Sequence, residues 1–356
     1  MRKWLLGMED ELVMVEETEK GYRASAYLQG AQPVQIASDP QNKQRLYCGT
    51  YGHGLWKSED GGYHWKAVGK VNSYHGPNQG NGISSACITG VMVHPIKTSS
   101  NGNSIVYAGT EPSALYFSED LGQTWIPFNG IKHLPSRPNW QFPPRPHTSH
   151  VRWIAPSYAN ENQLNVSIEF GAFIRSSDHG KHWQDRPFLS PLDTHTLLAH
   201  PNAPGRLYAA CGDGLRNPEL AYAQSEDEGR SWAFMSEGLE NHPYLYSMAL
   251  HPEDADYRLV SASESAAKAH HDSLYATIYR KKGNEDWKET AAGLPCDGSF
   301  IHTLTADPAQ PGIFYALNNQ GLFRLDADQE RWEKMNIPWP HKYLQQHPSC
   351  LMVVGQ

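Results

Sequence analysis

A short pattern, SxDxGxxW, recurs along the chain. It reads SEDGGYHW at residues 58 to 65, SEDLGQTW at 118 to 125, SSDHGKHW at 176 to 183 and SEDEGRSW at 225 to 232. Two weaker copies end at Trp287 and Trp332 and keep the tryptophan but lose most of the other residues. An internal repeat constrains the fold strongly, because each copy belongs to one structural unit that packs on the next.

A second landmark precedes each copy. It is a short apolar run that ends in proline and is followed by a Leu-Tyr-Ala-Gly-like strand, as in GVMVHP and then IVYAGT. The landmark prolines lie 40 to 61 residues apart and are Pro40, Pro95, Pro156, Pro201, Pro252, Pro308 and Pro348. Each unit can be written as four short strands, and a period of roughly 40 to 50 residues with four strands is typical of a β-propeller blade.

The sequence therefore predicts an all-β fold, a seven-bladed β-propeller that occupies residues 1–356 as a single domain. The last blade is expected to be composite. HKYLQQHP and CLMVVGQ from the C-terminus would supply its inner strands, and ELVMVEE and GYRASAYL near the N-terminus its outer ones. Pairing the two ends in one sheet would close the ring and remove free strand edges.

The octapeptide has the chemistry of a turn between the third and fourth strands of a blade. Its aspartate can accept backbone N–H bonds, its glycine can adopt a positive φ, and its tryptophan can bury a large ring between blades. The aspartates are Asp60, Asp120, Asp178 and Asp227, and the tryptophans are Trp65, Trp125, Trp183 and Trp232. We interpret these residues as scaffold.

These octapeptides resemble the Asp-box, or BNR, repeat of the sialidase-like propellers. The resemblance implies a structural role at the periphery. A sialidase also needs an arginine triad, with one arginine in an Arg-Ile-Pro-like motif of the first blade, and a Tyr/Glu nucleophile pair. No such motif precedes SEDGGYHW. The chain therefore resembles bacterial sialidase-like BNR proteins without the sialidase catalytic set, and the xyloglucanases of similar repeats differ in using two tandem propellers.

Composition excludes several classes of partner. The net charge is −8 with no run of like charges, which argues against nucleic-acid binding and a basic membrane patch. The sequence contains no stretch of about 18 consecutive apolar residues, so no transmembrane helix is expected. The first residues are typical of a strand rather than of a signal peptide. The five cysteines lack CxxC spacing, so reduced thiols and a cytoplasmic location are expected.

Ligands of propellers usually bind where loops meet at one mouth of the channel. The loops that we expect there are residues 66 to 88, 126 to 149, 211 to 222 and 263 to 273. The position six residues before each landmark proline, at the start of the inner strand, is occupied by Val34, Thr89, His150, His195, Tyr246, His302 and Lys342. Three histidines thus share one position of the repeat.

Antiparallel pairing should place Glu169 near His150, and Cys211 and Asp213 near His195, while Arg152 lies two residues beyond His150. Imidazoles with a carboxylate are a common ligand set for a divalent metal ion. We predict metal binding or catalysis by His150, His195, His302 and Glu169, with Tyr246 as a further catalytic residue. The predicted substrate-binding residues are Arg145, Arg152, Arg216, Asp213, His53 and Lys342. The alternative is that the histidines line a wet channel and bind only water.

Two functions follow from these expectations. The first is an enzyme, a metal-assisted hydrolase or lyase that acts on a small polar or sugar-like substrate. The second is a non-catalytic scaffold that holds a protein partner on its loop face, as in the assembly-factor propellers that carry similar repeats. Concentrated His, Arg and Glu favour the enzyme, whereas a flat aromatic patch would favour the scaffold.

Overall fold

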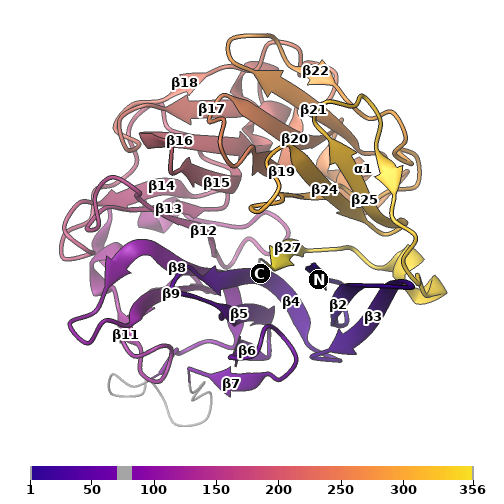
Figure 1. Ribbon diagram of the computed structural model, residues 1–356. Coiled ribbons are helices and arrows are strands. Elements are labelled where there is room, and N and C mark those ends of the chain that lie inside the picture. The colour runs from indigo at the N-terminus through magenta and orange to yellow at the C-terminus, as the bar shows by residue number, and fades with distance from the viewer. Residues whose placement is uncertain (1, 70–81, 355–356) are drawn as a thin grey trace. The chain divides into compact units, whose positions relative to one another are not determined.

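The computed structural model describes residues 2–69 and 82–354. In that part of the chain, 27 strands form seven sheets, six with four strands and one with three (Figure 1). The prediction of an all-β, seven-bladed β-propeller is confirmed. None of the helices in the described part is long and apolar enough to cross a membrane. All five cysteines are free thiols.

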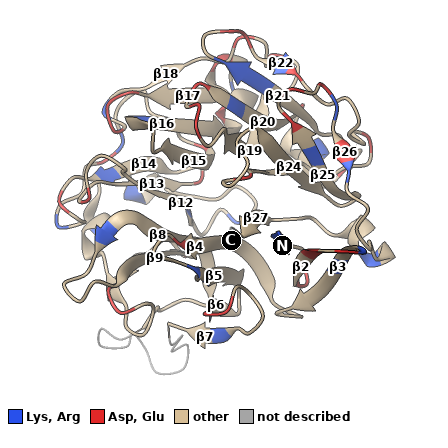
Figure 2. Ribbon diagram, in the orientation of Figure 1, with Lys and Arg blue, Asp and Glu red and all other residues tan. Residues whose placement is uncertain are grey.

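The chain divides into two compact units, and we describe each by itself. The first unit comprises Met1–Gln29, Tyr208–Gln224 and Ala233–Gln356, and the second comprises Gly30–Leu207 and Ser225–Trp232. Acidic and basic residues are interspersed along the strands and loops of both units (Figure 2). The prediction of a single domain over the whole chain stays a prediction.

The second unit contains three whole sheets and the start of a fourth. The first sheet has the order β4 (Gln32–Asp39), β5 (Asn42–Tyr51), β6 (Gly54–Ser58), β7 (Lys66–Val68). The next consists of β8 (Cys87–Thr98), β9 (Ser104–Glu111), β10 (Leu115–Ser118) and β11 (Ile126–Pro127), with β8 and β11 at its edges. The three-stranded sheet has the order β12 (Val151–Pro156), β13 (Leu164–Ile168), β14 (Ala172–Ser176).

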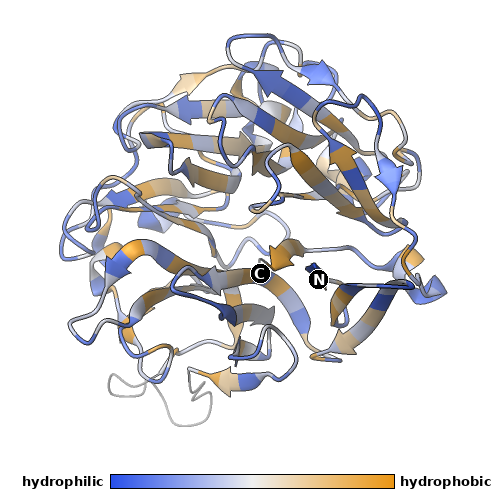
Figure 3. Ribbon diagram, in the orientation of Figure 1, coloured by the Kyte–Doolittle hydropathy of each residue, from blue (hydrophilic) through white to orange (hydrophobic). Residues whose placement is uncertain are grey.

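The fourth sheet has the order β15 (Thr194–His200), β16 (Ala203–Cys211), β17 (Tyr222–Ser225), β18 (Ala233–Phe234). The first unit contains two further sheets built in chain order. They are β19 (Tyr244–Leu250), β20 (Tyr257–Ser263), β21 (Thr277–Lys282) and β22 (Lys288–Glu289), then β23 (Thr303–Ala306), β24 (Ile313–Asn318), β25 (Gly321–Asp326) and β26 (Glu333–Lys334). Apolar and polar residues alternate along many of these strands (Figure 3), as expected for pleated strands with two different faces.

The composite sheet unites the two ends of the chain, as predicted, but with a different share from each end. Its order is β27 (Cys350–Val354), β1 (Lys3–Gly7), β2 (Leu12–Thr18), β3 (Gly21–Tyr27). The C-terminus thus supplies one strand and the N-terminus three. The apolar KWLLG segment, β1, pairs with β27 on one side and with β2 on the other, where Val354 and Glu16 lie opposite Lys3.

The strand predicted over HKYLQQHP is wrong. Residues His341–Gln345 form a 3-10 helix that begins directly after Pro340. Proline lacks the N–H that a ladder needs, so the segment between Pro340 and Pro348 is poorly suited to pair as a strand. Lys342 therefore does not occupy the inner-strand position of the other units. Its Nζ instead forms an ion pair with Glu11, 2.5 Å away.

The octapeptides form the predicted turns, and all four lie in the second unit. In the first, the Ser58 hydroxyl donates to Asp60 Oδ1 at 2.8 Å, and the backbone N–H of His64 donates to the same oxygen at 2.9 Å. Gly62 adopts a φ of 99° and donates its N–H to Ser58. The same Ser to Asp and Gly to Ser bonds recur in the other three turns. The turn satisfies its own polar groups, which supports its interpretation as scaffold.

The tryptophans of the four octapeptide turns, which we call box turns, are buried to different extents. Trp125 is 0% exposed and Trp232 is 9% exposed, whereas Trp65 and Trp183 are only half-buried. Trp125 belongs to a core cluster with Tyr47 and Leu55, which come from the preceding sheet. The prediction that all four indoles are buried is therefore wrong for Trp65 and Trp183.

Three of the four predicted loops contain short helices. Residues 126 to 149 contain 3-10 turns at Asn129–His133 and Arg137–Asn139, and residues 211 to 222 contain Gly212–Leu215 and Pro218–Leu220. The segment 263 to 273 contains α1 (Ala266–His270). Most of the polar part of the loop at 66 to 88, residues 70–81, lies outside the described residues.

Candidate functional site

Close packing of two sheets in the second unit positions the site. A Cβ on Gly109 of β9 would lie 2.4 Å from Val151 Cγ1, so only glycine allows β12 to approach this closely. The Thr89 hydroxyl of β8 donates to the Val151 carbonyl at 2.8 Å and fixes the same contact. His150, immediately before β12, is thereby held beside Glu111 at the end of β9.

Glu169 and His150 meet as predicted. Strands β12 and β13 pair with Val151 opposite Ile168, so the residue before β12 faces the residue after β13. The His150 Nε2–H donates to Glu169 Oε2 at 3.0 Å. Arg152 lies at a β-bulge between Val151 and Trp153, and its Nε is 3.0 Å from the same oxygen. Arg152 and His150 thus contact the same carboxylate oxygen.

A second imidazole approaches the other oxygen of Glu169. His195, in β15, has its Nε2 3.7 Å from Glu169 Oε1 and 3.6 Å from Asp193 Oδ1. One ligand atom each from Glu169, Asp193 and His195 lie within 4.8 Å of one another. The sequence predicts Glu169 beside His150 alone, whereas in the structure Glu169 lies near both His150 and His195.

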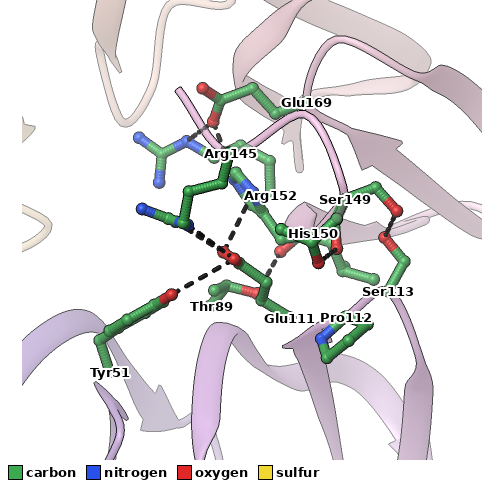
Figure 4. A network of polar contacts seen from close by, with 12 residues as sticks. Tyr51, Thr89, Glu111, Pro112, Ser113, Arg145, Ser149, His150, Arg152 and Glu169 are labelled. Atoms are coloured by element: carbon green, nitrogen blue, oxygen red, sulfur yellow. Dashed lines mark hydrogen bonds and ion pairs between the residues drawn. The ribbon is translucent and has the colours of Figure 1, made fainter. Parts of the chain in front are cut away.

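Arg145 holds an internal carboxylate. Its Nε and Nη2 donate to Glu111 Oε1 and Oε2 at 2.8 and 2.7 Å (Figure 4), a bidentate pair. Tyr51 donates its hydroxyl to Glu111 Oε1 at 3.2 Å. Burial and the Glu111 charge raise the pKa of Tyr51 to about 12, so it remains a neutral donor. The guanidinium predicted to grip a substrate carboxylate is thus already paired with Glu111.

His150 lies between the two glutamates. Its Nε2 bonds to Glu169, and its Nδ1 faces Glu111 Oε2 at 3.7 Å (Figure 4). The ring of Phe142 packs edge-on against the imidazole at 4.8 Å. The His150 side chain is 7% exposed and that of Glu169 is 14% exposed, so the contact is nearly dry.

Glu169 is held as an anion. Burial alone would raise its pKa, but the charges of His150, His195 and Arg152 and the hydrogen bond from His150 outweigh it and lower the pKa well below its usual range. A carboxylate with such a pKa is a poor proton donor or acceptor near neutral pH. It is suited to holding positive charge.

We refer to Tyr51, Glu111, Arg145, His150, Arg152, Glu169, Asp193 and His195 together as the Glu169 cluster. All of them lie in the second unit. The structure therefore brings together five of the predicted site residues, namely His150, His195, Glu169, Arg145 and Arg152.

Six predicted site residues remain. His53 is exposed and borders a shallow hollow that Leu55, Val68 and Gln123 also line. Tyr246, His302, Lys342, Asp213 and Arg216 belong to the first unit, so their part in this site stays a prediction.

His302 is buried in the first unit. Its Nδ1 lies 3.2 Å from the Asn318 side-chain nitrogen. Burial lowers the pKa of His302 to about 4, so the imidazole is neutral at pH 7. Asp213 is 5% exposed within the 3-10 turn Gly212–Leu215, and Arg216 directly follows that turn on the surface.

Sequence reasoning missed Glu111, Tyr51 and Asp193. Tyr51, Glu111 and Glu169 occupy the same place in RLYCGTY, SIVYAGTE and QLNVSIE, at the end of the second strand or directly after it. The pairing argument that found Glu169 at the start of β12 also places Glu111 at the start of β8, opposite Cys87, so part of this signal was present. Asp193 precedes β15 directly, and its adjacency to His195 is the only signal that we find for it.

No protein-family model matches the chain, and no curated protein matches it by sequence. Solved structures do match. The GH74 enzyme of Niastella koreensis superposes with a TM-score of 0.66 at 16% identity, over 92% of this chain and 51% of that one. The GH74 xyloglucanase of Xanthomonas campestris gives 0.60 at 14% identity, over 94% and 47%. YCF48 bound to a D1 peptide gives 0.57 at 15% identity, over 88% and 84%.

The shared feature is the propeller fold. At these identities the likeness is consistent with a sialidase-like propeller and carries no function across. The chain spans about half or less of the GH74 enzymes that it matches, and most of YCF48.

Proposed function

We propose that the chain is an enzyme, a hydrolase or lyase that acts on a small polar, sugar-like substrate at the Glu169 cluster. The observation that carries this proposal is His150, a buried imidazole with Nε2 3.0 Å from Glu169 and Nδ1 3.7 Å from Glu111. An imidazole that one carboxylate orients through Nε2, and that faces a second carboxylate through Nδ1, can exchange a proton with a substrate in the site.

The charges of the cluster indicate the kind of substrate. Glu111 and Arg145 neutralise each other, and Arg152 faces Glu169. Because both arginines hold internal carboxylates, they are poorly placed to grip an anionic substrate. The carboxylates can accept hydrogen bonds from hydroxyl groups. A neutral, hydroxyl-rich molecule such as an oligosaccharide therefore fits better than the sugar acid that a sialidase takes.

The test uses the full chain and a panel of neutral oligosaccharides that includes xyloglucan fragments. Mass spectrometry would detect cleavage products with added water, the mark of a hydrolase, or cleavage products without added water, the mark of a lyase. We expect turnover by the wild-type chain and a loss of 100-fold or more in His150→Ala and Glu111→Gln, about the share that one acid or base contributes.

His182→Ala is the matched control. His182 also contacts a carboxylate, with Nδ1 2.6 Å from Asp178, but it lies in a box turn and is 89% exposed. Its removal should leave turnover unchanged. Absence of any product across the panel, or full activity in His150→Ala, would overturn the proposal.

A second candidate is a scaffold that binds a protein partner. Two observations favour it: the chain covers 84% of YCF48, which was solved with a bound peptide, and Phe188 and Leu189 are 92% and 64% exposed in the loop before β15. Peptide binding that Phe188→Ser with Leu189→Ser abolishes, in a chain without turnover, would select this function over the enzyme.

A further inference from the structure

The two oxygens of Glu169 have different surroundings. Oε2 is 3.0 Å from both His150 Nε2 and Arg152 Nε, which together fix its position (Figure 4). Oε1 faces His195 Nε2 at 3.7 Å. That separation is longer than a hydrogen bond of about 2.7 to 3.2 Å. One oxygen is thus anchored by two donors while the other points toward an imidazole nitrogen.

Asp193 completes the same arrangement. Its Oδ1 lies 3.6 Å from His195 Nε2, again beyond hydrogen-bond length. Two atoms that each lie about 2.1 Å from one divalent cation are separated by about 3.6 to 3.7 Å when the angle at the cation is near 120°. The three ligand atoms lie within 4.8 Å of one another. If the angle between the Glu169 and Asp193 oxygens at the cation is also near 120°, these oxygens must lie about 3.6 Å apart, so they would close by at most about 1.2 Å.

We propose that Glu169 Oε1, Asp193 Oδ1 and His195 Nε2 bind one divalent transition-metal ion, and that His150 and Arg152 position Glu169 for it. This proposal rests on the proposed function, because it assigns a metal ion to the same cluster. It replaces the ligand set predicted from the sequence, in which His150 was itself a ligand. An imidazole with two carboxylates suits Zn²⁺, Mn²⁺ or Co²⁺.

The anchoring of Oε2 is what a ligating carboxylate requires. Ligands of catalytic metal ions are usually oriented by hydrogen bonds from neighbouring groups, and loss of such a group typically lowers metal affinity about 10- to 100-fold. His150 supplies this hydrogen bond here. Three protein ligands leave coordination positions open for water or substrate, and an ion bound in this way supplies a Lewis acid.

The charges agree with a cation at this point. Glu169 and Asp193 each bring a carboxylate oxygen to within 3.7 and 3.6 Å of His195 Nε2. His195 is 2% exposed and Asp193 14% exposed, so the ligands are held by the fold and the site still meets solvent.

The experiment uses the full chain, purified without an affinity tag and stripped with a chelator. Isothermal titration with ZnCl₂, MnCl₂ and CoCl₂ measures stoichiometry and affinity, and the visible spectrum of Co²⁺ reports the ligand set. We expect one ion per chain. Asp193→Asn and His195→Ala should lose affinity by 100-fold or more, and Asp193→Asn should also change the Co²⁺ spectrum.

The positioning role of His150 has its own signature. His150→Ala should lower affinity about 10- to 100-fold while the Co²⁺ spectrum keeps its shape, because the ligands are unchanged. His150→Gln, whose amide can donate to Oε2, should recover part of the loss. His182→Ala and His64→Ala, which remove exposed imidazoles beside box aspartates, are controls and should bind as the wild type does.

Two results would overturn the proposal: no saturable binding of any of the three ions, or affinity unchanged in both Asp193→Asn and His195→Ala. Asp193→Asn is nearly isosteric, so it keeps the test open if His195→Ala does not fold. The failures are distinguishable. A chain that turns over substrate without metal refutes only the metal site, and one that binds metal at these residues but turns over nothing refutes only the proposed function.

Discussion

Trp125 and Trp65 occupy the same position of the repeat but differ in burial, which gives a sharp test of what the box tryptophan does. Both indoles donate Nε1–H to the carbonyl of the box glycine, at 3.1 and 2.9 Å. Trp125 is fully buried and Trp65 is half-buried. Substitution by alanine removes the same hydrogen bond in both, so the difference in stability isolates burial of the ring.

The magnitude follows from the buried area. An aromatic side chain buries about 150 to 250 Å², and at about 25 cal/mol per Å² this corresponds to roughly 4 to 6 kcal/mol as an upper value. Measured losses for large aromatic residues are about 3 to 5 kcal/mol. We expect Trp125→Ala to lose about 3 to 5 kcal/mol of unfolding free energy and Trp65→Ala roughly half as much.

The assay is urea unfolding followed by far-UV circular dichroism, with Co²⁺ binding measured on the folded variants. Both variants should bind Co²⁺ with wild-type affinity, because neither tryptophan lies in the Glu169 cluster. Equal losses at the two positions would show that burial does not set the contribution. A stable Trp125→Ala chain that no longer binds would reverse the assignment of the box to the scaffold.

Three further predictions concern acid stability and the composite sheet. The pKa of Glu169 is lower in the folded state than its unfolded value of about 4.3. The stability that ionised Glu169 contributes is therefore present above that pH and is lost as the pH falls below it. Glu169→Gln should flatten the dependence of unfolding free energy on pH, measured by urea titrations between pH 3 and 7. Burial alone would raise the pKa of Asp60, but hydrogen bonds from His64 and Ser58 lower this pKa to about 2. The contribution of Asp60 to folding stability should therefore disappear as the pH falls from about 4 toward 2. NMR titration of the carboxylate should show the low pKa. Deletion of residues 350 to 356 removes β27 and uncovers one edge of β1, so the melting temperature should fall steeply, and a deletion variant that melts within about two degrees of the full chain would contradict the pairing.

The repeats predicted the fold because they set both the number of units and the strands within each. The period of the landmark prolines was enough for seven sheets, and the box turn followed from the preferences of aspartate and glycine. The composite sheet was harder. KWLLG and HKYLQQHP are both short and partly apolar, so either could be the second strand of this sheet. The structure shows that KWLLG is that strand, because Lys3 pairs on both sides, whereas residues 341 to 345 between two prolines form a 3-10 helix.

The site was predictable where pairing geometry alone places the residues. His150 and Glu169 follow from the register of β12 and β13. The register of β8 and β9 places Glu111 opposite Cys87, and only the packing of β12 on that sheet brings Glu111 to His150. Arg145 was different. Whether its guanidinium meets a substrate or Glu111 depends on the course of a loop of more than 20 residues, which no repeat constrains. Asp193 likewise reaches His195 through a loop conformation and not through strand register.

The pairing of β27 with β1 has a consequence for synthesis of the chain. Translation delivers β1 to β3 first, but the partner that covers the inner edge of β1 emerges only with residues Cys350–Val354. During that interval a nascent chain presents an apolar strand edge, the kind of surface that promotes wrong pairing. Most of the second unit, by contrast, comes from the contiguous segment Gly30–Leu207, which can begin to fold while still attached to the ribosome. Production yield should therefore depend on how β1 to β3 are protected until Cys350–Val354 have been synthesised.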